Sequence, residues 1–195
     1  MRTGSEVLKE SALRFVVIGG LAVILSFILF GPLAFNPFMT SFEYVASGVT
    51  IAIAYAAFKS ERVRNGLAAE LIWYVFLMTI IGYSNGWWNY VMEASYIIGL
   101  VAAVYLYFML INKRIVKGLI QRAVAVIIIV AVAHALIVIF LQLVNRGIFV
   151  HPLRSLGWSL MNLRNGTVIG VISAIGMEFS EYLINLPLFR PKVAE

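Results

Sequence analysis

The chain has no cysteine and no aspartate among its 195 residues, and each absence removes a class of function. Without cysteine, disulfides, thiolate metal sites and cysteine nucleophiles are excluded. All nine acidic residues are glutamate, which excludes paired aspartates and Asp-rich metal clusters. The sequence also lacks G-x-S-x-G, H-E-x-x-H and Walker motifs. With only two histidines, we expect no enzyme, no cofactor and no metal site.

Charge is scarce as well, because only 12% of the residues are charged and 62% are hydrophobic. A typical soluble domain carries about 25% charged residues. The mean hydropathy is +0.95, and a soluble fold of this size cannot hide so much apolar surface. We therefore expect a lipid bilayer to cover it, and residues 1–195 to form one membrane domain.

The apolar residues gather in six stretches, and a helical membrane span needs ~20 such residues. The Gly31-Pro32 turn ends the first stretch, which we interpret as an uncleaved span. The predicted spans cover about residues 15–33, 38–58, 67–83, 94–111, 119–144 and 166–186. The predicted fold is therefore all-α, a bundle of six transmembrane helices in a polytopic membrane protein.

The basic residues predict how this bundle is oriented. Twelve of the fifteen lysines and arginines fall on one side if the chain enters and leaves the membrane there. Because loops inside the cell are rich in Lys and Arg, both termini are expected to be cytoplasmic, in a cell inner (plasma) membrane. The net charge of +6 thus suits an anionic membrane face, and no nucleic-acid partner is expected.

The connection at 145–165 departs from this charge pattern, since its three arginines lie on the opposite side. We predict a short interfacial helix here, between the fifth and sixth spans. Its arginines either contact outer-leaflet phosphates, the favoured interpretation, or form an anion-binding mouth. Aromatic residues on this side favour an interfacial belt, with an outward pocket as the alternative. The candidate mouth residues are Trp87, Trp88, His151, Arg154 and Trp158.

The strongest polar constellation lies on the fifth and sixth spans. His134 is the only ionisable residue within the apolar stretch 123–141, and Glu178 and Glu181 share one face of the last span. Gly166 and Gly170 precede these carboxylates at intervals of four, so this face should pack against a neighbouring helix. Depth estimates from the helix rise allow a direct pair between His134 and Glu178.

Two interpretations of these residues stay open. In one, a His134–Glu178 pair relays protons or binds a cation or amine at mid-membrane depth. In the other, His134 is neutral and bonded to a carbonyl, while the glutamates lie near the cytoplasmic interface, which is favoured for Glu181. Glu70 is expected to pair with arginines at that interface, and Glu43 to be a solvated residue at a span end.

The function favoured by this pattern is binding or transport of a small solute or ion through a polar site between the fifth and sixth spans. The alternative is a sensing or scaffold subunit that docks a partner protein and transports nothing. Small residues on the second and last spans suit self-association. We therefore expect a homo-oligomer or a partner membrane subunit as a further possibility.

Overall fold

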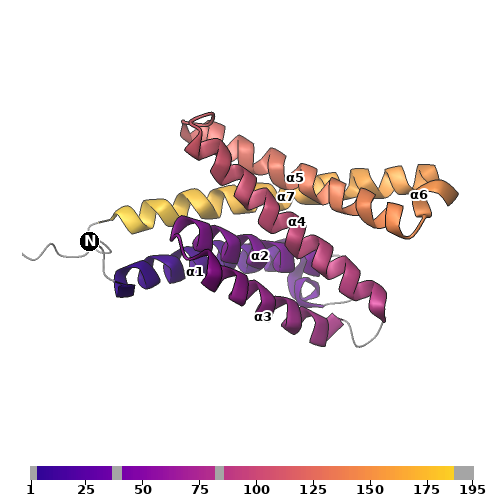
Figure 1. The fold of residues 1–195 in the computed structure, drawn as a ribbon, viewed down its shortest axis with the longest axis horizontal. Helices are drawn as coiled ribbons and strands as arrows, with labels where there is room; N and C mark the ends of the chain where they lie inside the picture. Colours follow the sequence, from indigo (N-terminus) through magenta and orange to yellow (C-terminus); the bar gives the residue numbers. More distant parts are fainter. Residues whose placement is uncertain (1–3, 37–40, 82–85, 187–195) are drawn as a thin grey trace, which may run out of the picture.

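The structure, a computed structural model, describes residues 4–36, 41–81 and 86–186. Within these ranges the chain is all-helical and contains no strand, which confirms the predicted class (Figure 1). The elements are α1 (Gly4–Phe30), η1 (Gly31–Phe35), α2 (Phe42–Lys59), α3 (Val63–Ile81), α4 (Trp87–Asn112), α5 (Leu119–Val144), α6 (Gly147–Val150) and α7 (Pro152–Asn185).

Five helices are long and apolar enough to cross a bilayer, namely α1 continued into η1, α3, α4, α5 and α7. Their outward faces are apolar, because large hydrophobic side chains on each of them are exposed. A soluble protein would cover such side chains, so this pattern indicates a multi-pass membrane protein.

The second predicted span, 38–58, corresponds to α2, whose described part begins at Phe42 and falls outside that set of five. This helix packs against α1, α3, α4 and α7. Most of its residues are buried by those neighbours. A helix covered by protein needs less hydrophobicity than one that faces lipid, which explains its polar residues. That α2 is a sixth crossing stays a prediction.

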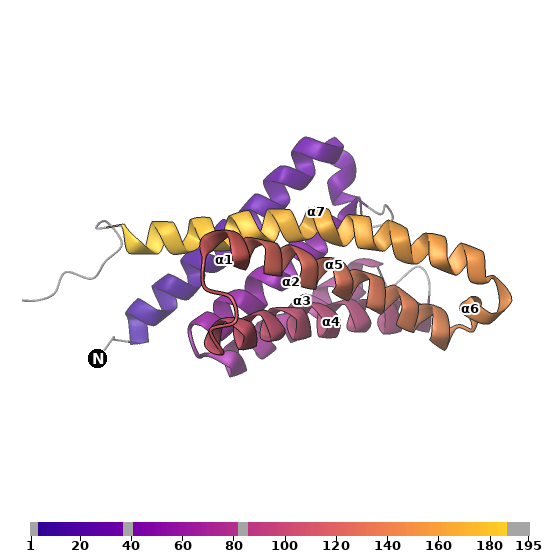
Figure 2. The same ribbon diagram turned by 90° about the horizontal axis from the view of Figure 1, so that it is seen from above.

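Successive long helices run in alternating directions, so α1 begins and α7 ends at the same end of the bundle (Figure 1). We call this the charged end, because ion pairs of Arg14, Lys59 and Arg122 with Glu178 and Glu181 gather there. Seen from above, α1 crosses the bundle obliquely and its far end stands out from the other helices (Figure 2).

The connection before the last helix differs from the prediction. The only helix inside it is the four-residue α6, and α7 already begins at Pro152, a favoured first position of a helix. The arginines of this segment suggested an interface, but polar residues between 155 and 165 recur with helical spacing and are buried. They are Ser155, Ser159, Asn162 and Asn165. The 34 residues of α7 therefore form one continuous helix.

Glycines set the close packing of α7, as the sequence predicted for Gly166 and Gly170. A Cβ atom on Gly166 would lie 2.9 Å from Ala131 Cα, and one on Gly170 would lie 2.8 Å from Ile127 Cα. There is thus no room for a side chain at either position. Both contacts are with α5, so α5 and α7 are antiparallel neighbours, as small residues in membrane helices allow.

Candidate functional site

The sequence-predicted pair of His134 and Glu178 does not form. Glu178 accepts two hydrogen bonds of 2.8 Å from Arg122 on α5. His134 is twelve residues after Arg122 on α5, and it faces Gly166, which is twelve residues before Glu178 on α7. The depth estimate placed the start of the last span at Gly166, whereas α7 begins at Pro152. Glu178 therefore lies roughly 18 Å along the helix from the level of His134.

Glu181 also lies in an ion-pair cluster at the charged end. Arg14 Nε donates to Glu181 Oε1 over 2.7 Å, and the Tyr55 hydroxyl donates to the same oxygen over 3.2 Å. Lys59 Nζ lies 3.6 Å from Glu181 Oε2. These contacts join α7 to α1 and α2, as the contact of Glu178 with Arg122 joins α7 to α5. The geometry of both glutamates thus supports a role in holding the helices together.

His134 is completely buried, and its two ring nitrogens have different neighbours. Nδ1 lies 2.9 Å from the Val130 carbonyl oxygen, which can only accept a hydrogen bond, so Nδ1 carries a proton. Nε2 points toward α2, where it lies 3.3 Å from Ser47 Oγ and 3.8 Å from Glu43 Oε1. The carboxylate facing the histidine is therefore Glu43, and not the predicted Glu178.

Tyrosine and asparagine side chains enclose this pair. The Tyr96 ring lies edge-on to His134 with 5.7 Å between centroids, and its hydroxyl donates to Asn162 Oδ1 over 3.0 Å. The Tyr44 hydroxyl donates to Asn165 Oδ1, also over 3.0 Å. Four helices contribute to the cluster. We name it the polar centre, consisting of Glu43, Tyr44, Ser47, Tyr96, His134, Asn162 and Asn165.

The polar centre lies at one level of the bundle. Glu43 is sixteen residues from Lys59 on α2, and Asn165 is sixteen residues from Glu181 on α7. At the rise of an α-helix, both lie roughly 24 Å from the charged end. His134, fifteen residues into α5, lies at roughly 22 Å. The cluster therefore lies toward the end of the bundle opposite the charged one.

The two atoms of the His134–Glu43 contact can share one additional proton. A neutral imidazole with its proton on Nδ1 presents a lone pair at Nε2, and an ionised carboxylate also presents only lone pairs. Glu43 Oε1 is buried and has no hydrogen-bond partner among the described residues. A proton on either group would turn two facing acceptors into a donor and an acceptor, or into an ion pair. Chemically, this pair can bind and release a proton.

Glu43 was missed because it lies in the first turn of α2, where a glutamate is usually solvated. The structure corrects that interpretation, since only 19% of its side chain is exposed. One signal was available in the sequence. Glu43 and Ser47 are four residues apart and therefore share a helix face with small and polar neighbours.

Glu70 also differs from its prediction as an interfacial ion-pair partner of arginine. It is 5% exposed on α3, and neither of its carboxylate oxygens has a hydrogen-bond partner within the described ranges. We expect Glu70→Leu to raise the melting temperature, because an unsatisfied buried polar group costs about 1–3 kcal/mol. Thermal unfolding of the purified protein measures this. A lower melting temperature than wild type would mean that Glu70 has a stabilising partner.

The candidate mouth residues lie at the end of the bundle where α4 and α7 begin (Figure 1). Trp87 and Trp88 form an edge-to-face pair with 5.7 Å between centroids. Arg154 lies over the Trp158 ring at 5.4 Å, while His151 precedes α7 and is exposed. Because Trp87 is 69% and Trp158 47% exposed, these rings do not enclose a pocket. Their role as a mouth stays a prediction.

Two grooves lie elsewhere on the bundle and are lined mainly by apolar residues. One, of about 510 Å³, lies between α4 and α5, and Ser95 is its polar residue. The other, of about 280 Å³, is formed by α1, α2 and α3. Neither is lined by a residue of the polar centre. Among the described residues, no three His, Cys, Asp or Glu side chains gather in a way that could hold a metal ion.

Comparison of the chain with models of protein families, with curated proteins and with solved structures gave no match. The functional interpretation therefore depends on the geometry of the polar centre and on the bilayer as its surroundings.

Proposed function

We propose that this protein is a multi-pass membrane protein, with α2 as its sixth crossing, that binds a small cation at the polar centre. The proton is the cation that we consider first. The observation that carries the proposal is the buried contact of 3.8 Å between His134 Nε2 and Glu43 Oε1. In this view the charged end faces the cytoplasm, because most basic residues lie there.

The location of the pair supports a functional role. Ionisable side chains within membrane-spanning helices are costly, and they usually mark ion pathways or proton sites. Ion pairs at the charged end already join the helices, so the fold has no evident need for a second charged pair inside. Glu43 is partly exposed and His134 is not. This arrangement favours access to the pair from the Glu43 side.

Proton binding at His134 can be tested directly, because His134 and His151 are the only histidines in the chain. A His151→Asn background leaves His134 as the single imidazole, which ¹⁵N NMR of histidine-labelled protein in nanodiscs can follow across pH. We expect Glu43→Gln to move the midpoint of the His134 titration by at least about one pH unit, the effect of a neighbouring charge.

Glu178→Gln is the matched control, because that carboxylate is bonded to Arg122 and lies far from His134. It should leave the His134 titration unchanged. If Glu43→Gln also leaves it unchanged, or if His134 shows no response at any pH at which the protein stays folded, the proton-binding proposal is wrong.

A second candidate function is a sensing or scaffold subunit that docks a partner. The complete burial of His134 favours it, since transport requires a path for the solute to the site. Proteoliposomes with a pH-sensitive dye inside distinguish the two. Proton or cation flux that Glu43→Gln abolishes supports transport. A pH-dependent His134 signal without flux supports a sensor that binds a proton but does not conduct it.

A further inference from the structure

We propose that α1, α2 and α3 form a binding site for one anionic phospholipid of the leaflet at the charged end. Its acyl chain would lie in the groove between these helices, and its phosphate would contact Arg62. This inference is independent of the polar centre, which lies toward the other end of the bundle.

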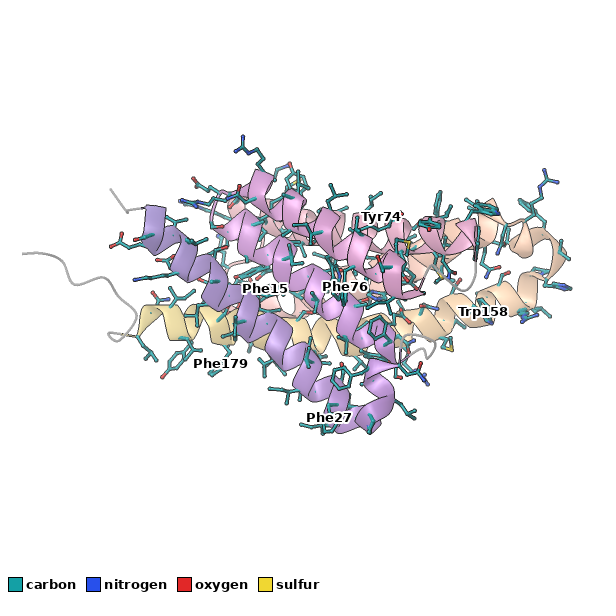
Figure 3. The ribbon with its side chains drawn as sticks, turned by 90° about the horizontal axis from the view of Figure 1, so that it is seen from below. Phe15, Phe27, Tyr74, Phe76, Trp158 and Phe179 are labelled. Atoms are coloured by element: carbon teal, nitrogen blue, oxygen red, sulfur yellow. The ribbon has the colours of Figure 1, made fainter. Side chains whose placement is uncertain are left out.

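The groove exists because two helices pack on α2 without contacting each other. Both α1 and α3 contact α2, whereas α1 and α3 share no contact. The face of the bundle on which they lie is shown in Figure 3, with Phe15 labelled on α1 and Phe76 on α3. Ile53, Ala56 and Ala57 of α2 contribute to the lining between them. The groove is therefore a slot above α2.

Close contacts at the charged end fix the walls of this slot. Ser11 of α1 donates a hydrogen bond of 3.4 Å to the Ala56 carbonyl oxygen on α2. On the other side, Gly66 of α3 lies so close to Ala57 that a side chain at Gly66 would overlap it. Both walls are thus anchored on α2.

The residues that line the slot change from apolar to polar toward the charged end. Its inner part is formed by Phe15, Ile53 and small residues such as Ala69, while Arg62 and Asn65 lie at its polar end. Ile53 is six residues from Lys59, so the slot extends roughly 9 Å from the charged end. An apolar channel with a cation at its interfacial end complements a hydrocarbon chain that carries an anionic headgroup.

Arg62 is able to bind a phosphate in this position. Its Nη2 donates to the Gly4 carbonyl oxygen over 3.2 Å. A guanidinium has five N–H donors, so donors remain for phosphate oxygens. Residues 59–64 carry Lys59, Arg62 and Arg64 against Glu61, a net charge of +2 (three positive, one negative), although Lys59 also lies 3.6 Å from Glu181. The loop therefore favours an anionic headgroup over a zwitterionic one.

The size of the slot argues for a single chain of lipid. Its volume is about 280 Å³, just below the ~300–1,000 Å³ of typical ligand pockets. A helix from a partner is about 10 Å wide with its side chains and would require α1 and α3 to move apart. A free phosphate ion would leave the apolar lining unused.

Native mass spectrometry of the purified full chain tests the proposal, with phosphatidylglycerol and phosphatidylcholine of identical acyl chains as probes. Wild type should retain one phosphatidylglycerol in preference to phosphatidylcholine. Arg62→Gln should weaken phosphatidylglycerol binding about fivefold, the effect of one basic residue near an anionic membrane surface. It should leave phosphatidylcholine binding unchanged.

Arg64→Gln is the matched control, because Arg64 lies in the same basic segment but does not line the slot. It should weaken phosphatidylglycerol binding clearly less than Arg62→Gln does, because its charge is nearby but does not line the slot. Ala69→Leu and Ala12→Leu fill the slot from opposite walls and should each reduce the binding of both lipids. Retained melting temperatures would show that these variants fold.

Three results would overturn the proposal. The first is an equal loss of phosphatidylglycerol in Arg62→Gln and Arg64→Gln, which would indicate charge attraction without a site. The second is unchanged lipid binding in both folded leucine variants, which would place the lipid elsewhere. The third is a dimer without retained lipid in the wild-type spectrum that both leucine variants abolish, which would identify a second copy of the chain as the occupant.

Discussion

Replacing Arg14 by alanine is expected to destabilise the protein by about 3 kcal/mol or more, the cost of removing one partner from a buried ion pair. Arg14 is only 4% exposed, and its guanidinium contacts Glu181 on α7 and Glu10 on α1. Without Arg14, the carboxylate of Glu181 keeps the Tyr55 hydroxyl at 3.2 Å and the more exposed Lys59 at 3.6 Å. Thermal or denaturant unfolding in one detergent would measure the loss.

Lys59→Ala is the control for this prediction, because Lys59 approaches the same carboxylate from a more exposed position. Its side chain is 38% exposed and its Nζ lies 3.6 Å from Glu181. Exposed ion pairs contribute about 0–1 kcal/mol, so a small change is expected. The combined variant Arg14→Leu with Glu181→Leu should recover most of the stability, since apolar replacement removes both charges. Equal losses in Arg14→Ala and Lys59→Ala would contradict this account.

Gly170→Ala is expected to have the second large effect, a loss of about 1–3 kcal/mol from overpacking. The new Cβ would lie 2.8 Å from Ile127 Cα and 3.1 Å from Ile127 O. Both are backbone atoms of α5, which cannot rotate away as the end of a side chain can. The two helices must therefore separate along their contact, and the melting temperature should fall.

Gly20→Ala provides the comparison, because Gly20 lies in α1 and an added Cβ would have no atom within 4 Å. Alanine is favoured over glycine inside a helix by about 1 kcal/mol. This variant should therefore be as stable as wild type or slightly more stable. If Gly20→Ala and Gly170→Ala lower the melting temperature equally, the close contact of α5 with α7 is not the cause.

The helices were largely predictable from the sequence, because long apolar stretches and turn residues determine them directly. The face of α7 that packs on α5 was also predictable, since Gly166 and Gly170 recur every four residues. The same pattern did not reveal where α7 begins. Its first turns contain polar residues, and the sequence alone does not distinguish a polar residue that is buried against another helix from one that is exposed to solvent.

The partner of His134 could not be predicted for the same reason. A pairing of helices depends on register, and an error of a few residues in one helix end moves the predicted partner by several ångströms. Arg122 offered a check, because opposite charges on neighbouring helices tend to lie at the same depth. Aligning Arg122 with Glu178 would have placed His134 beside Gly166, as observed.

The hydrogen bond between Tyr44 and Asn165 spans 121 residues of sequence. Ribosomes add about 5–20 residues per second, so the two ends of this bond are made roughly 6 to 25 s apart. During that interval α2 has been synthesised, but the asparagine that pairs with it has not. The first half of the protein must therefore wait at the membrane with the Tyr44 hydroxyl lacking this partner, and insertion of the final helix completes the assembly of the polar centre.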